Sequence, residues 1–329
     1  MTASQSRVTP LRRGTGNGTT RGGGRRMLGG RQPPASMPIG ELAALATALF
    51  WAFTGLFFAE AARRLGALRV NLLRLPLALA LLTLTMLAGG PDFAALDGRR
   101  TAYLAASGVV GLVIGDLALF EALRRIGARL ALLVMALAPV FAAAAGLVLL
   151  HERPGPRATL GIVVTLAGVA WVVGERRTGS GDARHDARGV ALALVGAACQ
   201  GIGLVLAKVG MAGEVPALTG TWVRMGAATA LIWALTAATG RTRGLEVAAA
   251  VRTTWPYLLG GAIFGPFLGV WMSLVAARLT DVGVAATLMA TTPVLVIPLL
   301  MATERYRPTA RALAGTAITV AGVALLFAS

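Results

Sequence analysis

The sequence predicts an all-α integral membrane protein of ten transmembrane helices, arranged as two inverted five-helix repeats. Two observations lead to this fold class: a series of apolar stretches, each close to the ~20 residues that a helix needs to cross the bilayer, and two halves of the chain that match at one fixed offset. Composition agrees, since 56% of the 329 residues are hydrophobic and only 14% are charged. Soluble proteins carry about 25% charged residues.

The offset between the halves is 154 residues, the separation of Pro139 from Pro293 (293 − 139). Further identical residues occur at the same separation: Gly111/Gly265, Gly115/Gly269, Arg124/Arg278, Met135/Met289, Pro154/Pro308, Arg157/Arg311, Thr165/Thr319 and Gly168/Gly322. Duplicated helical segments with Gly and Pro at corresponding places are typical of secondary transporters. Because each half holds an odd number of spans, the second half must enter the membrane in the opposite sense.

The apolar stretches set the expected spans and domains. The spans are 40–59, 68–88, 102–122, 130–150, 158–174, 189–209, 217–238, 255–276, 283–302 and 309–327. They group into a first repeat, 40–175, and a second, 187–328, joined by one longer polar connection. Residues 1–36 are rich in Arg and Gly and nearly free of large apolar side chains, which predicts a disordered tail.

Charge and composition exclude several classes of function. The net charge of +17 lies mainly in the tail and in short loops, so it favours contact with anionic lipid over nucleic acid. The single cysteine, Cys199, excludes an internal disulfide and a multi-thiolate metal site. The two histidines, His151 and His185, lie in predicted loops without acidic partners, and no phosphate-binding G-x-x-x-x-G-K-[ST] motif occurs. We therefore expect neither an enzyme nor a bound cofactor.

Several motifs occur in the same order in both halves. An Arg stands early in the second span of each (Arg74 in NLLRLPLALALL, Arg224 in TWVRMGAATALI), and ALRRIGA closes the third span at 122–128. The later motifs are ALAPVFAAAAGLVLLHER, ATTPVLVIPLLMATER, GIVVTLAGVAWVV and GTAITVAGVALLF. In this order the chain resembles the EamA-type transporters of the drug/metabolite transporter superfamily over nearly all of 40–328. The resemblance implies ten helices around a central substrate cavity that opens alternately to each side, with both termini in the cytoplasm.

The third span carries a carboxylate at a depth where charge is costly. Asp116 lies among apolar neighbours, whereas the second half has Val270 at the corresponding position. Burial disfavours the charged form of a carboxyl group, which suits a proton carrier or a clamp for a cationic group. The other interpretation is a structural ion pair, with Arg74 as the best partner. Glu121 lies nearly on the opposite face, and we expect it to reach the membrane surface.

Other polar and aromatic side chains are candidates for substrate contact. Arg74 and Arg224 are each expected either to bind a carboxylate substrate or to anchor a helix at the membrane interface. Gln200 offers neutral hydrogen bonds in the second half. Trp51, Phe120 and Trp271 are expected to form apolar or stacking walls of the cavity, with simple helix packing as the alternative.

Two prolines are candidate hinges. Pro139 and Pro293 each remove one helical hydrogen bond in the fourth span of their half. Their matching placement favours a mechanical role, although membrane helices also tolerate proline.

Together these features predict a secondary transporter of the plasma membrane. We expect it to export a small metabolite, an amino acid or a drug-like solute, by alternating access. The driving force is either an ion gradient, with Asp116 as the group that carries proton coupling, or the solute's own gradient. The expected partners are this small-molecule substrate and the lipid bilayer, with no nucleic acid. Two other classes stay open at this point: a non-transporting membrane scaffold that acts through the basic tail, and an intramembrane enzyme. Deleting residues 1–36 and measuring transport separates the scaffold from the transporter.

Overall fold

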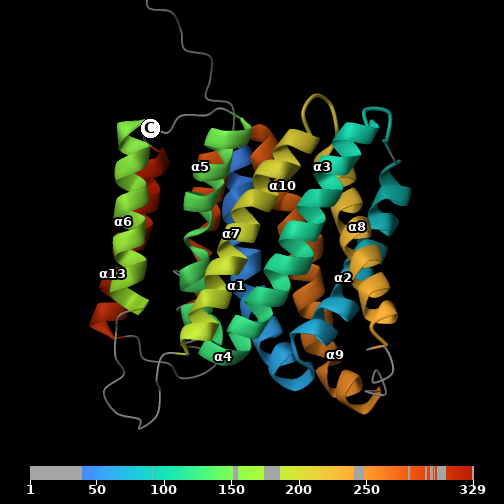
Figure 1. The fold of residues 1–329 in the computed structure, drawn as a ribbon, viewed down its shortest axis with the longest axis horizontal. Coiled ribbons are helices and arrows are strands. Elements are labelled where there is room, and N and C mark those ends of the chain that lie inside the picture. The colour runs from blue at the N-terminus through green and yellow to red at the C-terminus, as the bar shows by residue number, and fades with distance from the viewer. Residues whose placement is uncertain are drawn as a thin grey trace, which may run out of the picture. The chain divides into compact units, whose positions relative to one another are not determined.

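The computed structural model describes residues 39–90, 92–150, 155–173, 186–240, 248–280, 282–292 and 309–327, together with 295, 296, 299 and 301. All regular elements in this part of the chain are helical (Figure 1). Six helical segments among the described residues are long and apolar enough to cross a membrane: Ile39–Leu65, Ala67–Gly89, Gly98–Ala128, Leu130–Leu149, Ala187–Gly210 and Arg252–Leu279. The tail predicted at 1–36 lies outside the described residues.

The same series of elements occurs in each half of the chain. The first half contains α1 (Ile39–Leu65), α2 (Ala67–Gly89), α3 (Gly98–Gly108), η1 (Val109–Gly115), α4 (Asp116–Met135), α5 (Ala138–Leu149) and α6 (Pro156–Val173). The second contains α7 (Ala187–Gly210), α8 (Ala217–Ala238), α9 (Ala248–Ala262), η2 (Ile263–Gly269), α10 (Val270–Leu279), α11 (Val282–Met289) and α13 (Ala310–Phe327). The π-helical segments η1 and η2 start and end 154 residues apart, and so do α6 and α13. The duplication that the sequence predicts is therefore present in the helix boundaries.

Each π-helical segment packs against the first helix of the other half. The segment η1 contacts α7, and η2 contacts α1. Glycines make these approaches feasible, because a Cβ atom at Gly115 would lie 2.9 Å from the Cβ atom of Cys199 on α7. In the same way, a Cβ atom at Gly269 would lie 2.8 Å from Nε1 of Trp51 on α1. The spacing of four that separates the glycines in each segment thus permits close contact between the halves.

The second helices of the two halves are joined by tryptophans. Nε1 of Trp222 donates to Oγ1 of Thr83 at 3.0 Å, and Nε1 of Trp233 donates to the carbonyl oxygen of Leu72 at 3.1 Å. Both bonds run from α8 to α2. The two side chains are only partly buried, and each indole N–H has a hydrogen-bond acceptor on the neighbouring helix, so these contacts help to align the two helices.

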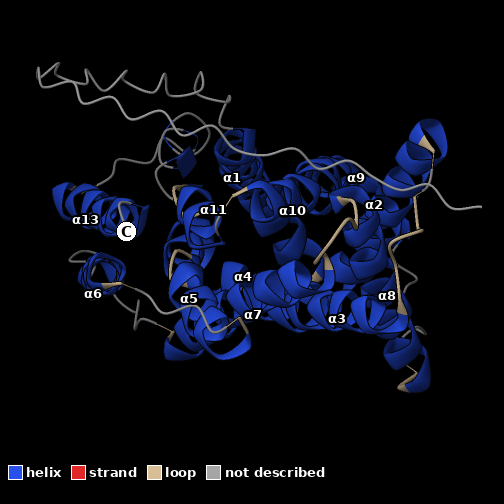
Figure 2. Cartoon of the chain, turned by 90° about the horizontal axis from the view of Figure 1, so that it is seen from above, coloured by secondary structure: helices blue, strands red, loops and turns tan. Residues whose placement is uncertain are grey.

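The helices α6 and α13 form a close pair at one side of the described bundle (Figures 1 and 2). A Cβ atom at Gly168 would lie 2.6 Å from the backbone nitrogen of Thr319. The corresponding Cβ atom at Gly322 would lie 2.8 Å from Oγ1 of Thr165. Each helix therefore places its threonine against the glycine of the other, and the small residues bring the two backbones together.

The fourth span of each half is interrupted near its start. Between α4 and α5 the backbone turns at Ala136–Leu137, and Pro139 is the second residue of α5. The amide of Leu137 bonds to the carbonyl of Val134 at 3.0 Å, an i to i−3 bond that tightens the chain at this point. After α11 the chain turns at Ala290–Thr291. The proline predicted as the second hinge, Pro293, lies outside the described residues.

A polar contact connects the start of the second half to the first. Asp186 caps α7 by accepting from the backbone amide of Arg188 at 3.0 Å, and its Oδ2 accepts from Nη1 of Arg125 at 2.9 Å. The hydrogen bond from the Arg125 guanidinium holds the pKa of this carboxyl below its usual range.

Candidate functional site

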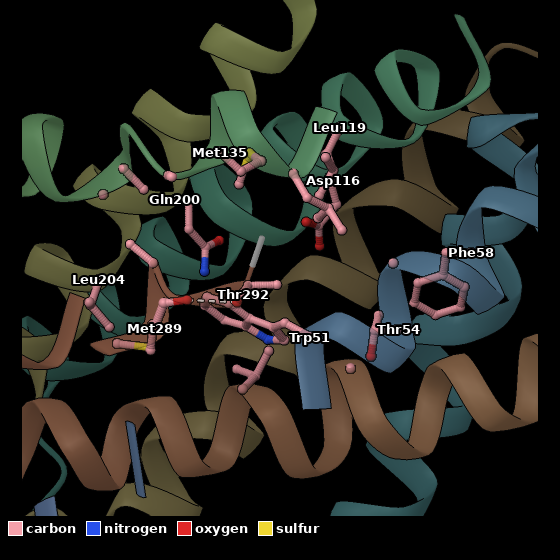
Figure 3. A pocket seen from close by; sticks show the side chains of 18 of the residues that line it. Trp51, Thr54, Phe58, Asp116, Leu119, Met135, Gln200, Leu204, Met289 and Thr292 are labelled. Carbon is pink, nitrogen blue, oxygen red and sulfur yellow. Dashed lines mark hydrogen bonds between the residues drawn. The ribbon is translucent and has the colours of Figure 1, made fainter. Parts of the chain in front are cut away.

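A cavity of about 110 Å³ lies between residues of the two halves (Figure 3). The first half contributes residues from α1, α2, η1, α4 and α5, and the second contributes residues from α7, η2, α10 and α11. Among the residues that line it are Trp51, Arg74, Asp116, Phe120, Pro139 and Gln200. The cavity thus brings together six of the nine candidate positions, which are separated by up to 149 residues in the sequence.

In the wall of the cavity Arg74 pairs with Asp116. Nη2 of Arg74 donates to Oδ2 of Asp116, and the two side chains are 4% and 14% exposed. The structure confirms the predicted pairing of these residues. Arg74 is buried in the cavity lining, and its contact with a substrate stays a prediction.

Backbone and side-chain acceptors hold the arginine in place. Nε of Arg74 donates to Oδ1 of Asn71 at 2.7 Å, and Nη2 also donates to the carbonyl oxygen of Leu112 at 3.4 Å. Nδ2 of Asn71 donates to the same carbonyl at 3.0 Å. Leu112 belongs to η1, and π-helical segments often occur at functional sites. The guanidinium is therefore fixed from two sides.

Two aromatic rings cover the pair. Cζ of Arg74 lies 4.8 Å from the ring centroid of Phe120 and 5.5 Å from that of Phe58. The two rings meet edge to face, with centroids 5.1 Å apart and planes at 64°. Cation–π contacts stabilise a desolvated guanidinium, so the rings contribute to its binding environment as well as to packing.

The rest of the cavity is neutral. Asp116 and Gln200 extend into it above the indole of Trp51 and the side chain of Thr292 (Figure 3). Oγ1 of Thr292 donates to the carbonyl oxygen of Met289 at 2.6 Å. The Gln200 amide makes no hydrogen bond to any residue that the structure describes, which leaves its donors and acceptor available to a ligand.

Both helix interruptions border this space. Met135, Ala136 and Pro139 line it from the first half, and Ala290 and Thr292 line it from the second. Because residue 139 is a proline, the carbonyl of Met135 lacks its α-helical donor. The hinge role of Pro139 stays a prediction, and the structure places this residue in the cavity wall.

Two candidate residues lie outside the lining. Trp271 on α10 packs against Phe267, with ring centroids 6.1 Å apart. Arg224 on α8 is only 3% exposed, and a Cβ atom at Gly111 would lie 3.3 Å from its Nη2. Its Nε atom is buried without a hydrogen-bond partner in the described part of the chain. Arg224 is thus buried within the helix bundle and lies outside the cavity lining, so its predicted contact with a substrate stays a prediction.

Glu121 is separate from the cavity lining. Its Oε1 atom accepts from Nε of Arg125 at 2.7 Å, and its Oε2 atom accepts from Nε of Arg124 at 2.9 Å. The Glu121 side chain is 26% exposed, and both arginines lie within four residues of it on the same helix. We assign it no contact with substrate.

Sequence reasoning did not identify Asn71, Phe58 or Thr292. Asn71 had a usable signal, because it is a polar residue three positions before Arg74 and so lies on the same helix face. Phe58 and Thr292 had none, since an apolar or hydroxyl side chain in a membrane span is ordinary.

Chemically, the cavity offers hydrogen-bond donors, one carboxylate and aromatic surface. The Nη1 group of Arg74 and Oδ1 of Asp116 have no hydrogen-bond partner among the described residues. Within the same residues no group of three or more His, Cys, Asp or Glu side chains is placed to hold a metal ion. These features suit reversible binding of a small polar solute with an apolar part.

Comparison with known proteins identifies the family. The model of the EamA-like transporter family matches residues 38–174 and again 187–328. One solved protein crystal structure has the same fold, with a TM-score of 0.66 and 22% sequence identity over 88% of this chain and 96% of that one. No curated protein matches. The chain belongs to the EamA-like transporter family of the drug/metabolite transporter superfamily, and is a multi-pass integral membrane protein with two EamA repeats.

Proposed function

We propose that this protein is a secondary transporter that exports a small metabolite, an amino acid or a drug-like solute, across the plasma membrane by alternating access. The cavity between the two repeats carries this proposal, because it is lined by residues of both and has a buried charged pair in its wall. Family membership supports a membrane transporter of this superfamily.

The proposal includes ten membrane-spanning helices in two inverted repeats. Exchanged contacts between the halves support it. The segment η1 packs on α7 and α8, while η2 packs on α1 and α2. Such reciprocity is expected when an approximate two-fold axis relates two repeats and their interface holds the substrate site.

The proposed motion occurs at the helix interruptions. Turns at Ala136–Leu137 and Ala290–Thr291 border the cavity from opposite repeats. At the first turn Ala136 and Leu137 make i to i−3 bonds in place of regular α-helical ones, and Pro139 has no amide to donate; at the second turn Thr291 also makes an i to i−3 bond. Such irregular points are where a helix bends. We propose that these two points act as the hinges through which the cavity changes the side to which it opens.

Asp116 is the proposed site of proton coupling. Its carboxylate faces the cavity and pairs with a buried arginine, so protonation would release that pair and change the charge in the cavity (Figure 3). A coupling group must bind a proton on one side of the membrane and release it on the other. Among the described residues, no other carboxylate lines the cavity.

A transport experiment tests both parts. A solute-efflux screen in cells that express the full chain identifies the substrate, and counterflow of that solute into proteoliposomes then measures transport by the purified protein. We expect counterflow with the wild type, and none in liposomes without protein. If the folded, reconstituted protein transports none of the solutes found in the screen, the proposed transport function is wrong.

For the coupling, we expect Asp116→Asn to lose transport driven by a pH gradient while it retains solute exchange, because asparagine keeps the shape of aspartate but does not titrate. Full pH-driven transport by this variant would assign the coupling to another group. Glu121→Gln is the matched control, since Glu121 pairs with arginines away from the cavity lining.

A further inference from the structure

We propose that the solute carried by this transporter is an organic anion, held through a carboxylate beside Arg74 in the cavity and attracted there by the charge of Arg224, which has no ion-pair partner among the described residues. This inference rests on the proposed transport function and adds its substrate class.

The buried charges do not balance. Arg74 and Arg224 are both 3% exposed, and the only carboxylate near them among the described residues is that of Asp116. Asp116 forms its ion pair with Arg74. Arg224 takes part in no hydrogen bond or ion pair with any described residue, and its Nε atom is buried without a partner. The cluster of Arg74, Asp116 and Arg224 therefore carries one excess positive charge in a medium of low dielectric constant.

An excess buried charge is unfavourable unless a counter-ion can reach it. Taking an ion out of water costs several kcal/mol, and a nearby opposite charge is what offsets that cost. Arg224 is next to the cavity wall: its Nη2 group lies against Gly111, whose neighbour Leu112 lines the cavity. A negative charge bound in the cavity near Leu112 would neutralise the excess positive charge of the cluster.

The cavity also supplies direct donors for an anion. Nε and Nη2 of Arg74 are used by Asn71, Leu112 and Asp116, but Nη1 has no partner among the described residues. Arg74 lines the cavity, so the two N–H groups of Nη1 are available to a carboxylate. Arginine binds carboxylates through short, charge-assisted hydrogen bonds, and this geometry favours them over neutral acceptors.

The apolar residues of the cavity lining set the rest of the substrate. Trp51, Leu204 and Met289 present apolar surface, and Gln200 adds one neutral amide (Figure 3). A small aliphatic or aromatic body that carries a carboxylate matches this combination of a charged pair and apolar walls.

Four compounds with one six-carbon skeleton test the charge directly: 4-methylpentanoate, its amide, 4-methylpentylamine and leucine. Binding of each to the full-length protein in nanodiscs is measured by titration calorimetry and by the shift in melting temperature. We expect the carboxylate to bind at least about tenfold more tightly than the amide, a difference that corresponds to about 1.4 kcal/mol. Stronger binding of the amine, of the amide or of zwitterionic leucine would overturn the assignment of an anion.

Variants at residue 224 test the role of the second arginine. We expect Arg224→Gln to weaken binding of the carboxylate about tenfold or more while the melting temperature of the free protein stays level or rises, because this change removes an unpaired buried charge. Arg224→Lys keeps the charge and should retain most of the affinity. Arg188→Gln, which removes an exposed arginine at the start of α7, is the matched control and should bind as the wild type does.

The outcomes separate this inference from the proposed function. If the carboxylate binds with the expected preference but no solute is transported, the proposed transport function is wrong and the proposed anion site is supported. If transport occurs but prefers neutral or cationic solutes and is unchanged in Arg224→Gln, the proposed anionic substrate is wrong and the proposed transport function is supported. Reduced melting temperature of the free Arg224→Gln protein, with unchanged affinity, would show a purely structural role and overturn the inference.

Discussion

Replacing Arg74 by alanine is expected to destabilise the folded protein by about 3–5 kcal/mol, because it leaves the carboxylate of Asp116 buried without its ion-pair partner. The same change removes the donors to Asn71 and Leu112 and the cation between Phe58 and Phe120. The measurement is the fraction of monodisperse protein after detergent extraction, together with its melting temperature.

The double variant separates charge from packing. Arg74→Ala combined with Asp116→Ala should recover part of the yield, since neither charge is then left alone. Arg188→Ala serves as the control for loss of an exposed arginine. If Arg74→Ala alone extracts and melts like the wild type, the ion pair contributes nothing to the fold and its assignment to the site is wrong.

Adding a single methyl group at Gly108 is expected to disturb the contact between α3 and α8. A Cβ atom there would lie 2.9 Å from both Cα and the carbonyl carbon of Arg224, closer than real Cβ contacts allow. Backbone atoms cannot rotate out of the way as a side chain can, so Gly108→Ala must push the helices apart. Overpacking of this kind costs about 1–3 kcal/mol, and it should also move Arg224 away from η1.

Gly226→Ala is the matched control on α8. No atom lies within 4 Å of the position that its Cβ would occupy, so we expect a melting temperature equal to or slightly above that of the wild type. Equal melting temperatures for Gly108→Ala and Gly226→Ala would contradict the close approach of α3 to α8.

Much of the helical order could be predicted from the sequence because duplication leaves a regular mark. The constant separation of Gly111 from Gly265 and of Gly115 from Gly269 places both pairs in π-helical segments. The same separation places Thr165 and Thr319 in the α6–α13 pair. A backbone in lipid must be helical to satisfy its own hydrogen bonds, so apolar length alone indicates the element type.

The rotation and tilt of the helices relative to one another could not be predicted in the same way. Arg74 and Arg224 stand at similar places in their spans, yet one pairs with Asp116 inside the cavity lining and the other lies behind it. Rotation and tilt of a helix depend on packing with its neighbours, which a single sequence does not specify. The π-helical segments could not be predicted either, because a glycine-rich apolar run is compatible with an ordinary α-helix.

The most direct test of this account is whether the cavity opens to both sides of the membrane. Met135→Cys, placed in a Cys199→Ala background, puts one thiol in the cavity wall (Figure 3). Leu133→Cys is the buried control two residues away and is not part of the lining. A membrane-impermeant maleimide is applied to right-side-out and to inside-out vesicles. Alternating access predicts labelling of Met135→Cys from both faces and of Leu133→Cys from neither. Labelling of Met135→Cys from one face only, or from none, would contradict it.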